Sequence, residues 1–233
     1  VAALATTQGC SNLQEDTGGT CLTTEFSVRW ASAPARSLDM VVVIDDSSSM
    51  ADAQQAFVEH FPAVLRSLLI ETDADGDTCP EHHVLDDLRL AVLTPNLGSH
   101  GLGLPGCNDY ARGDDACFQR APAPDATDCA EAYPAFLALD RRDMAADSFD
   151  RLVSDAGCLA ARGTEGCGIE QPLSAALRAL TTQSHEGNCN AGFRRPDVPL
   201  AVIFLTDEDD GSLDPDHPEL LDPERTDLGA LTI

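Results

Sequence analysis

The chain has 233 residues, of which 43% are hydrophobic and 23% are charged, a composition typical of a globular protein. No apolar run approaches the roughly 20 residues that a membrane-spanning helix needs, so we predict no transmembrane helix. Forty acidic residues outnumber fourteen basic ones, all of them arginines, and give a formal net charge of −26. Such a chain repels nucleic acids and anionic lipids and favours bound cations.

Nine cysteines indicate an oxidising, extracytoplasmic location, which would be secreted, periplasmic or at the cell surface. None belongs to a C-x-x-C pair, so we expect disulfides rather than a zinc knuckle or a redox motif. The odd number leaves one cysteine over, and two interpretations stay open. Either Cys10 follows a short apolar export signal and carries a lipid anchor, or it pairs with Cys21 and another cysteine is free or bonds outside this chain.

We divide the chain into an N-terminal lead-in, 1–37, with a lipoprotein tail and an edge strand, and a main domain, 38–233. Residues 38–44 predict the clearest strand, because the unbroken apolar run up to Ile44 is typical of a parallel strand buried on both faces. Residues 51–70 have apolar side chains at helical spacing and predict an amphipathic helix, kinked at Pro62.

A second strand is expected at 88–93, followed by a long irregular insertion at about 95–145 that contains three cysteines and needs disulfide staples. Two amphipathic helices follow, with Pro172 in the first turn of the second. Their apolar positions are Phe149, Leu152, Val153 and Ala156, then Ile169, Leu173, Ala176, Leu177 and Leu180. Residues 199–205 predict the last strand.

The strands at 38–44 and 199–205 both run directly into aspartates. In an open parallel sheet the carboxyl ends of the strands lie along one edge, where ligands usually bind. We therefore predict an α/β fold with a mostly parallel central sheet flanked by helices, and a ligand site where these two strands end.

The sharpest motif is Asp45-Asp46-Ser47-Ser48-Ser49, between the first strand and the first helix. Alternate residues Asp45, Ser47 and Ser49 can turn a carboxylate and two hydroxyls toward one point, and such oxygen donors suit Mg²⁺, Mn²⁺ or Ca²⁺. The alternative is a turn that caps the helix through Ser49 or Asp46. The second acidic strand end, at 206–210, favours the metal site.

With these motifs the chain resembles a von Willebrand factor type A domain, whose metal-ion-dependent adhesion site reads D-x-S-x-S after the first strand. Asp45, Ser47 and Ser49 match that element, and Thr206-Asp207 after a hydrophobic strand matches the Asp that the family supplies from a third loop, which nominates Asp207. Where the family has Gly-Thr in a second loop, this chain reads GCGIEQPL, and Glu170 is the nearest oxygen donor.

The resemblance covers residues 38–212 and is strongest to bacterial, myxobacteria-like extracytoplasmic lipoproteins. It implies a Rossmann-like fold with more strands than we can assign, so we expect the C-terminal part of the domain to be missing and an edge of the sheet to be exposed. It also implies a divalent cation, Mg²⁺ or Ca²⁺, held by Asp45, Ser47, Ser49, Glu170 and Asp207.

Replacement of the family's threonine by Glu170 has a physical consequence. Three ionised carboxylates around one divalent ion leave a net negative charge, so an acidic ligand gains less, and a chelating glutamate favours Ca²⁺. Alternatively, Glu170 stays outside the ligand shell, bonded to water, and leaves a coordination position open.

The function implied by the resemblance is metal-dependent protein–protein interaction, as in cell adhesion, with a carboxylate of an unknown protein partner completing the ion's coordination. We expect no enzyme activity, because the motif places nothing basic or nucleophilic beside the ion. Two alternatives stay open. One is a metal-dependent phosphohydrolase, although Ser47 stands where that chemistry needs a second Asp, and the other is a structural domain whose ion only ties the loops together.

Overall fold

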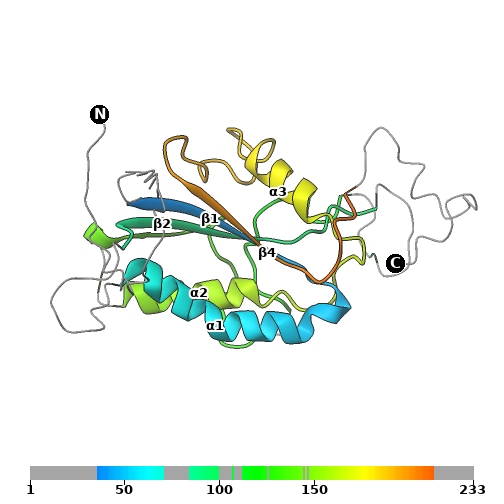
Figure 1. Cartoon of the computed structure of the whole chain (residues 1–233), viewed down its shortest axis with the longest axis horizontal. Helices are drawn as coiled ribbons and strands as arrows, with labels where there is room; N and C mark the ends of the chain where they lie inside the picture. The colour runs from blue at the N-terminus through cyan, green and yellow to red at the C-terminus, as the bar shows by residue number, and fades with distance from the viewer. Residues whose placement is uncertain are drawn as a thin grey trace, which may run out of the picture. The chain divides into compact units, whose positions relative to one another are not determined.

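The computed structural model describes residues 36–70, 84–99, 107, 112–124, 126–143, 145 and 147–212. Our predictions for the N-terminal lead-in with Cys10 and Cys21, and for the chain after Ser212, lie outside these residues. The described strands form one sheet in the order β3-β2-β1-β4 (Figure 1). Their bounds are Ser37–Ile44 for β1, Asp87–Leu93 for β2, Leu137–Asp140 for β3 and Leu200–Leu205 for β4.

The sheet is mostly parallel, as predicted. β1 pairs in parallel with both β2 and β4, whereas β3 runs antiparallel to β2. β3 lies within the stretch 95–145 that we expected to be irregular throughout, and this expectation was wrong. Only Leu137 and Leu139 of its four residues are buried, and so short an alternation cannot be told from a loop in a sequence.

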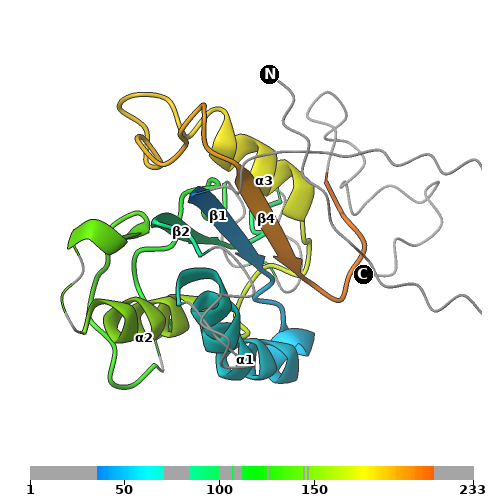
Figure 2. The ribbon, with the colours of Figure 1, turned by 60° about the vertical axis from the view of Figure 1, so that its left-hand side comes forward.

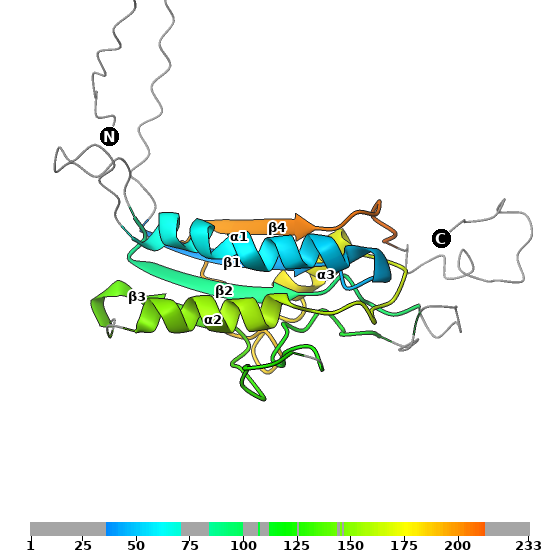
Figure 3. The ribbon, with the colours of Figure 1, turned by 90° about the horizontal axis from the view of Figure 1, so that it is seen from below.

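β1 is buried on both faces, which confirms the prediction from its apolar run. Met40, Val42 and Ile44 point into one apolar cluster and Val41 and Val43 into the other. Helices α1, Ala51–Leu69, and α2, Ser148–Ala160, cover the first face, and α3, Pro172–Leu180, covers the second (Figure 2). Seen from below, α1 and α2 lie side by side along the sheet (Figure 3).

On the first face, α1 matches its predicted range, and α2 contains the apolar positions that predicted a helix there. A short 3₁₀ turn, η1, at Ser48–Met50 leads into α1, which continues past Pro62 and buries Phe61, Leu65 and Leu69. Helix α2 buries Phe149, Leu152 and Ala156 at the expected spacing and follows a second 3₁₀ turn, η2, at Arg141–Asp143. None of the helices in the described ranges is long and apolar enough to cross a membrane.

Helix α3 faces the sheet through a different side from the one its leucines predicted. Leu173 and Leu177 are 58% and 66% exposed, whereas the buried side consists of alanines. The alanines of α3 pack with Val41 and Val43 of β1 in the second apolar cluster, and Leu180 packs against that cluster, whereas Leu173 and Leu177 face outward. With Leu200 and Phe204 of the edge strand β4, they are four of the five large hydrophobic side chains that are exposed among the described residues, the fifth being Val64 of α1.

Disulfides tie the insertion to the rest of the domain, as expected. The described residues contain the pairs Cys107–Cys167, Cys117–Cys189 and Cys129–Cys158. They join the insertion to α2 and to the segments on either side of α3. Such bonds form in oxidising compartments, which supports an extracytoplasmic environment.

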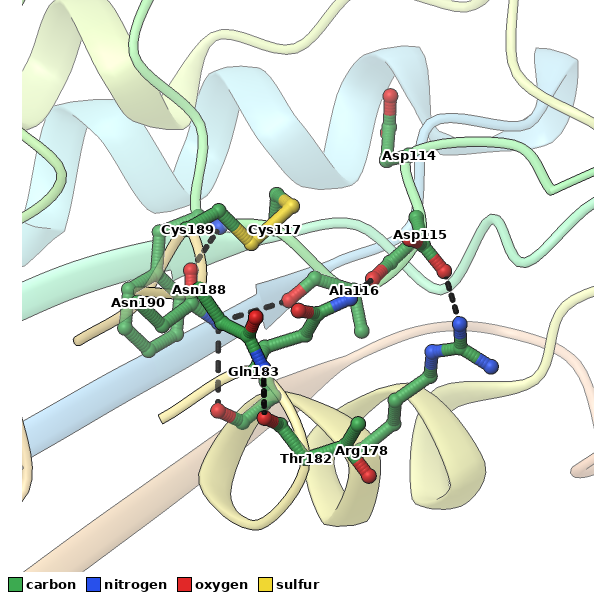
Figure 4. Close-up of a disulfide and its surroundings, with 12 residues drawn as sticks. Asp114, Asp115, Ala116, Cys117, Arg178, Thr182, Gln183, Asn188, Cys189 and Asn190 are labelled. Atoms are coloured by element: carbon green, nitrogen blue, oxygen red, sulfur yellow. Dashed lines mark hydrogen bonds and ion pairs between the residues drawn. A yellow bond between two sulfur atoms is a disulfide. The ribbon is translucent and has the colours of Figure 1, made fainter. Parts of the chain in front are cut away.

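Buried hydrogen bonds reinforce the pair Cys117–Cys189 (Figure 4). Asn190 donates from Nδ2 to the backbone oxygens of Ala116, at 2.8 Å, and Ala179, at 3.2 Å. Nearby contacts are Gln183 to the Asp115 oxygen, Asn188 to the Thr182 oxygen, and the ion pair of Arg178 with Asp115. The insertion is therefore fastened to the C-terminal end of α3 by both covalent and polar contacts.

Candidate metal site

The two acidic strand ends meet at one rim of the sheet. β1 and β4 are parallel neighbours with Ile44 opposite Leu205, so the loops that follow them start side by side (Figure 1). The backbone N–H of Asp45 donates to the Leu205 oxygen over 3.0 Å, which extends the pairing into the loops. This register brings the Asp45–Ser49 loop next to Asp207.

Four of the five predicted site residues come together at this rim. The hydroxyl oxygens of Ser47 and Ser49 lie 3.2 Å apart, and Ser49 Oγ donates to Asp207 Oδ1 over 3.2 Å. Asp45 lies behind them and is buried. Its Oδ1 accepts from the Ser47 N–H at 2.8 Å and its Oδ2 from Thr206 Oγ1 at 2.9 Å.

The structure does not support the helix-capping interpretation of this motif. Within the described residues, neither η1 nor α1 begins with a hydrogen bond from a capping side chain. The Ser49 hydroxyl instead contacts Ser47 and Asp207. The motif therefore directs its oxygens toward the rim rather than toward the helix.

The spacing of these oxygens fits a divalent cation. Ligands at roughly 2.1 Å from an octahedral ion lie about 3.0 Å apart when they occupy adjacent positions, and about 3.4 Å apart around the larger Ca²⁺. The two separations of 3.2 Å, which join Ser47, Ser49 and Asp207, fall in this range. Hydroxyl and carboxylate oxygens are the donors that Mg²⁺, Mn²⁺ and Ca²⁺ prefer.

Glu170 lies near the rim but outside this set. It is buried just before α3, and its backbone oxygen accepts from the Gly211 N–H at 2.7 Å. Burial and the carboxylates of Asp45, Glu208 and Asp207 raise the pKa of Glu170 to about 7. In the described part of the chain, no three His, Cys, Asp or Glu side chains are placed to hold an ion together, so the three predicted carboxylates do not form one cluster.

The loop at 163–170 packs tightly on the middle of the motif. Gly166 donates its N–H to the Asp46 oxygen at 2.8 Å, and a Cβ at Gly166 would overlap the Asp46 carboxylate and lie 2.7 Å from that oxygen. Position 166 therefore requires glycine, because a side chain there would clash with Asp46. Burial and the carboxylate of Asp114 raise the pKa of Asp46 to about 7, although the charge of Arg162 lowers it.

Gln54 joins the same two loops, and sequence reasoning missed it. Its Nε2 donates to the backbone oxygens of Asp45, at 2.7 Å, and Gly163, at 2.8 Å. Its Oε1 accepts from the N–H groups of Arg162, at 3.0 Å, and Gly163, at 3.1 Å. A glutamine within an amphipathic helix carries no sequence signal that distinguishes such a buried role from a solvated one.

The acidic residues that follow β4 make two different kinds of contact. Asp207 contacts Ser49 at the rim, whereas Asp210 accepts from the Leu173 N–H at 2.8 Å at the start of α3. An acidic side chain is favourable there because the first N–H groups of a helix carry a partial positive charge. Thr206, which positions Asp45, is the other residue whose role the sequence did not specify.

Comparison of this chain with protein-family models, with curated proteins and with solved structures found no match. Its own strand order and helix placement show a mixed α/β domain with a mostly parallel sheet flanked by helices, which is compatible with a Rossmann-like fold.

Proposed function

We propose that this chain is a divalent-cation-binding module of the von Willebrand factor type A kind, which binds a protein partner through the cation at the rim of its sheet. One observation carries the proposal. Ser49 and Asp207, 158 positions apart in the sequence, meet with their oxygens 3.2 Å apart, and Ser47 lies at the same distance from Ser49.

Ser47, Ser49 and Asp207 would hold the ion, and Asp45 would orient the loop behind them. Each Asp45 oxygen keeps a second lone pair, so it can also bind the ion directly or through water. When bound, the cation supplies a positive centre that attracts a carboxylate oxygen. Ser49 and Asp207 are exposed, so a partner can reach that centre.

The charge of the chain supports partner binding that depends on the cation. The chain carries a net charge of −26, so an acidic partner is repelled unless a bound ion neutralises the rim locally. We assign Glu170 no position on the ion, because the described carboxylates do not form a cluster that could hold one, and the proposal reserves that coordination position for the partner. Mg²⁺ and Ca²⁺ both suit this donor set.

The contacts at the rim favour interaction over a purely structural ion. Two hydrogen bonds that do not involve Ser47, Ser49 or Asp207 join the two loops, from the Asp45 N–H to the Leu205 oxygen and from the Thr206 hydroxyl to the Asp45 carboxylate. An ion that served only to tie them would therefore add little. A phosphohydrolase is disfavoured because its second Asp is replaced by Ser47 and the chain has no lysine to neutralise a phosphate.

We place the module outside the cytoplasm, on a secreted, periplasmic or surface-anchored protein. The three described disulfides support an oxidising environment. Anchoring through a lipid on Cys10 is part of the proposal and is tested by mass spectrometry of the protein from its native membrane fraction.

Titration calorimetry of chelator-treated protein with Mg²⁺ and with Ca²⁺ tests the cation site. We expect one site per chain, lost in Ser49→Ala and in Asp207→Asn. Asp209→Asn is the matched control, because Asp209 is an exposed acid of the same run and should leave the affinity unchanged. Absence of cation binding, or equal binding by all variants, would contradict the proposal.

A further inference from the structure

A hollow of about 700 Å³ lies beside the 45–49 loop, which carries the proposed cation ligands Ser47 and Ser49. It lies between the first turns of α1 and the segment that follows α2, and a third wall comes from the insertion. Its aliphatic lining residues are Ala51, Val58, Pro124, Ala126 and Ala161. The volume is within the range of known ligand pockets, which spans roughly 300 to 1,000 Å³.

The walls of the hollow are held in place by contacts within the chain. Gln54 lines the hollow and joins the Asp45 backbone to the backbone of Arg162 and Gly163 through the four hydrogen bonds described above. Arg162 donates to the Ala121 oxygen and to Gln119 Oε1, each at 2.8 Å. Contacts within the protein therefore hold the walls of the hollow in place, and walls that are fixed in this way lower the entropic cost of binding a ligand.

The lining favours an apolar group over an anion. The terminal nitrogens of Arg162 are both engaged in the contacts just given, and its Nε has no hydrogen-bond partner among the described residues but is buried. The guanidinium group is therefore turned to the protein rather than to a ligand in the hollow. The exposed charge at its edge is that of Glu165, which repels anions. A side chain such as Leu, Ile or Phe matches the aliphatic surface.

The hollow and the proposed ion are neighbours on one surface. Gln54, which lines the hollow, donates a hydrogen bond of 2.7 Å to the backbone oxygen of Asp45. Ala51, another lining residue, directly follows the turn that contains Ser49. A single partner segment can therefore reach both places at once.

We propose that the hollow is the second contact point of the partner, which presents a carboxylate to the cation and a bulky apolar side chain, within a few residues of it, to the hollow. The contact between the partner's carboxylate and the cation rests on the proposed function above. The contact of the apolar side chain with the hollow makes the module selective among acidic partners, because a carboxylate alone is present on every acidic surface. Burial of a leucine-sized group strengthens binding by about tenfold to a hundredfold.

Peptide titrations with the full chain in saturating Mg²⁺ test this, with fluorescence anisotropy as the readout. The probes are acetylated peptide amides with Leu one, two or three residues before an Asp, with glycine elsewhere, and their counterparts with Gly in place of Leu. We expect the best Leu peptide to bind about tenfold or more tightly than its Gly counterpart. Equal affinity of both peptides at all three spacings would overturn the proposal.

Two variants locate the effect. Ala126→Trp fills the hollow and should abolish the advantage of Leu while leaving the Gly peptide unaffected. Val64→Trp is the matched control, because Val64 is 44% exposed on α1 and does not line the hollow. An advantage that persists in Ala126→Trp would place the leucine elsewhere and overturn the proposal.

A second readout does not depend on a folded Ala126→Trp variant. In methyl spectra of the native chain, the Leu peptide should shift the signals of Val58, Ala126 and Ala161, and shifts confined to other methyl groups would refute the assignment. Calorimetry with Mg²⁺ alone, done first, distinguishes a failure of the proposed function from a failure of the proposal about the hollow. No cation binding would refute the proposed function, whereas cation binding without a Leu advantage would refute only the hollow.

Discussion

Ser49 Oγ donates a hydrogen bond to Asp207 Oδ1 over 3.2 Å, although 158 positions separate the two residues. The contact follows from the parallel pairing of β1 with β4, which places Ile44 opposite Leu205 and starts both loops at the same level. The site is thus a direct product of strand register. Variants of the loops that frame it should affect stability and cation binding in separable ways.

Gln54→Ala should destabilise the chain far more than its neighbour Gln55→Ala. Gln54 is buried and bridges two loops through four hydrogen bonds, so its removal leaves several buried backbone groups without partners. We expect a loss of about 3 kcal/mol in the free energy of unfolding by urea. Gln55 is exposed, and its variant should stay within about 0.5 kcal/mol of the parent. Similar losses for both variants would contradict the bridging role.

Gly166→Ala should both destabilise the fold and weaken cation binding. The added Cβ would lie 2.7 Å from the Asp46 oxygen and displace the loop that carries Ser47. Overpacking of this kind costs about 2 kcal/mol. Gly157→Ala is the control, since a Cβ there meets only Val58 at 3.8 Å and the α2 helix gains from alanine. Thermal melts and cation titrations of both variants check this, and normal cation affinity in Gly166→Ala would contradict the tight packing.

The cation-free protein should become less stable as the pH rises from about 5 to 8. Asp46 has a pKa of about 7 in the folded chain, above its unfolded value, so the folded state binds the proton more tightly in this window. Stability gained by protonation at low pH is lost as the pH passes 7, and amounts to about 2 kcal/mol at most.

Urea unfolding in a chelating buffer at pH 5.5 and 8 measures this dependence, and Asp46→Asn should reduce it. Glu170 adds a change of the same sign, because its pKa is also raised, to about 7. A free energy of unfolding that increases between these two pH values would show that the carboxylates at the rim are not crowded in the folded chain.

Substitutions on α3 should reveal which side of the helix faces the sheet. Leu177→Gln should change the free energy of unfolding by less than about 0.5 kcal/mol, because Leu177 is largely exposed. Ala179→Leu should cost about 1 to 3 kcal/mol, because Ala179 is fully buried among the valines of β1. Chemical denaturation of both variants checks the assignment, which would be wrong if Leu177→Gln were the more damaging change.

Some of this architecture is readable from the sequence because its signals are strong. The apolar run of β1 and the helical spacing in α1 and α2 arise from burial that dominates the local energy, so pattern and structure agree. The sequence also predicts that the D-x-S-x-S motif and the acidic run with Asp207 lie at one rim, because parallel strands end together.

Other features depend on contacts that a linear pattern does not contain. Leucines and alanines of α3 both recur at helical spacing, and only the packing of the helix against β1 decides that the alanines face inward. The roles of Gln54 and Thr206 arise from loops that meet only after folding. Disulfide pairing likewise cannot be deduced from cysteine spacing.

A crystal of the protein soaked in Mn²⁺, with anomalous scattering measured at the manganese edge, tests the central claim most directly. We predict a single strong peak at the rim, about 2.2 Å from Ser47 Oγ and Ser49 Oγ, with the Asp207 carboxylate bound directly or through one water. Absence of a peak at saturating Mn²⁺, or a peak among the exposed acids at 208–209 that touches neither serine, would contradict the account.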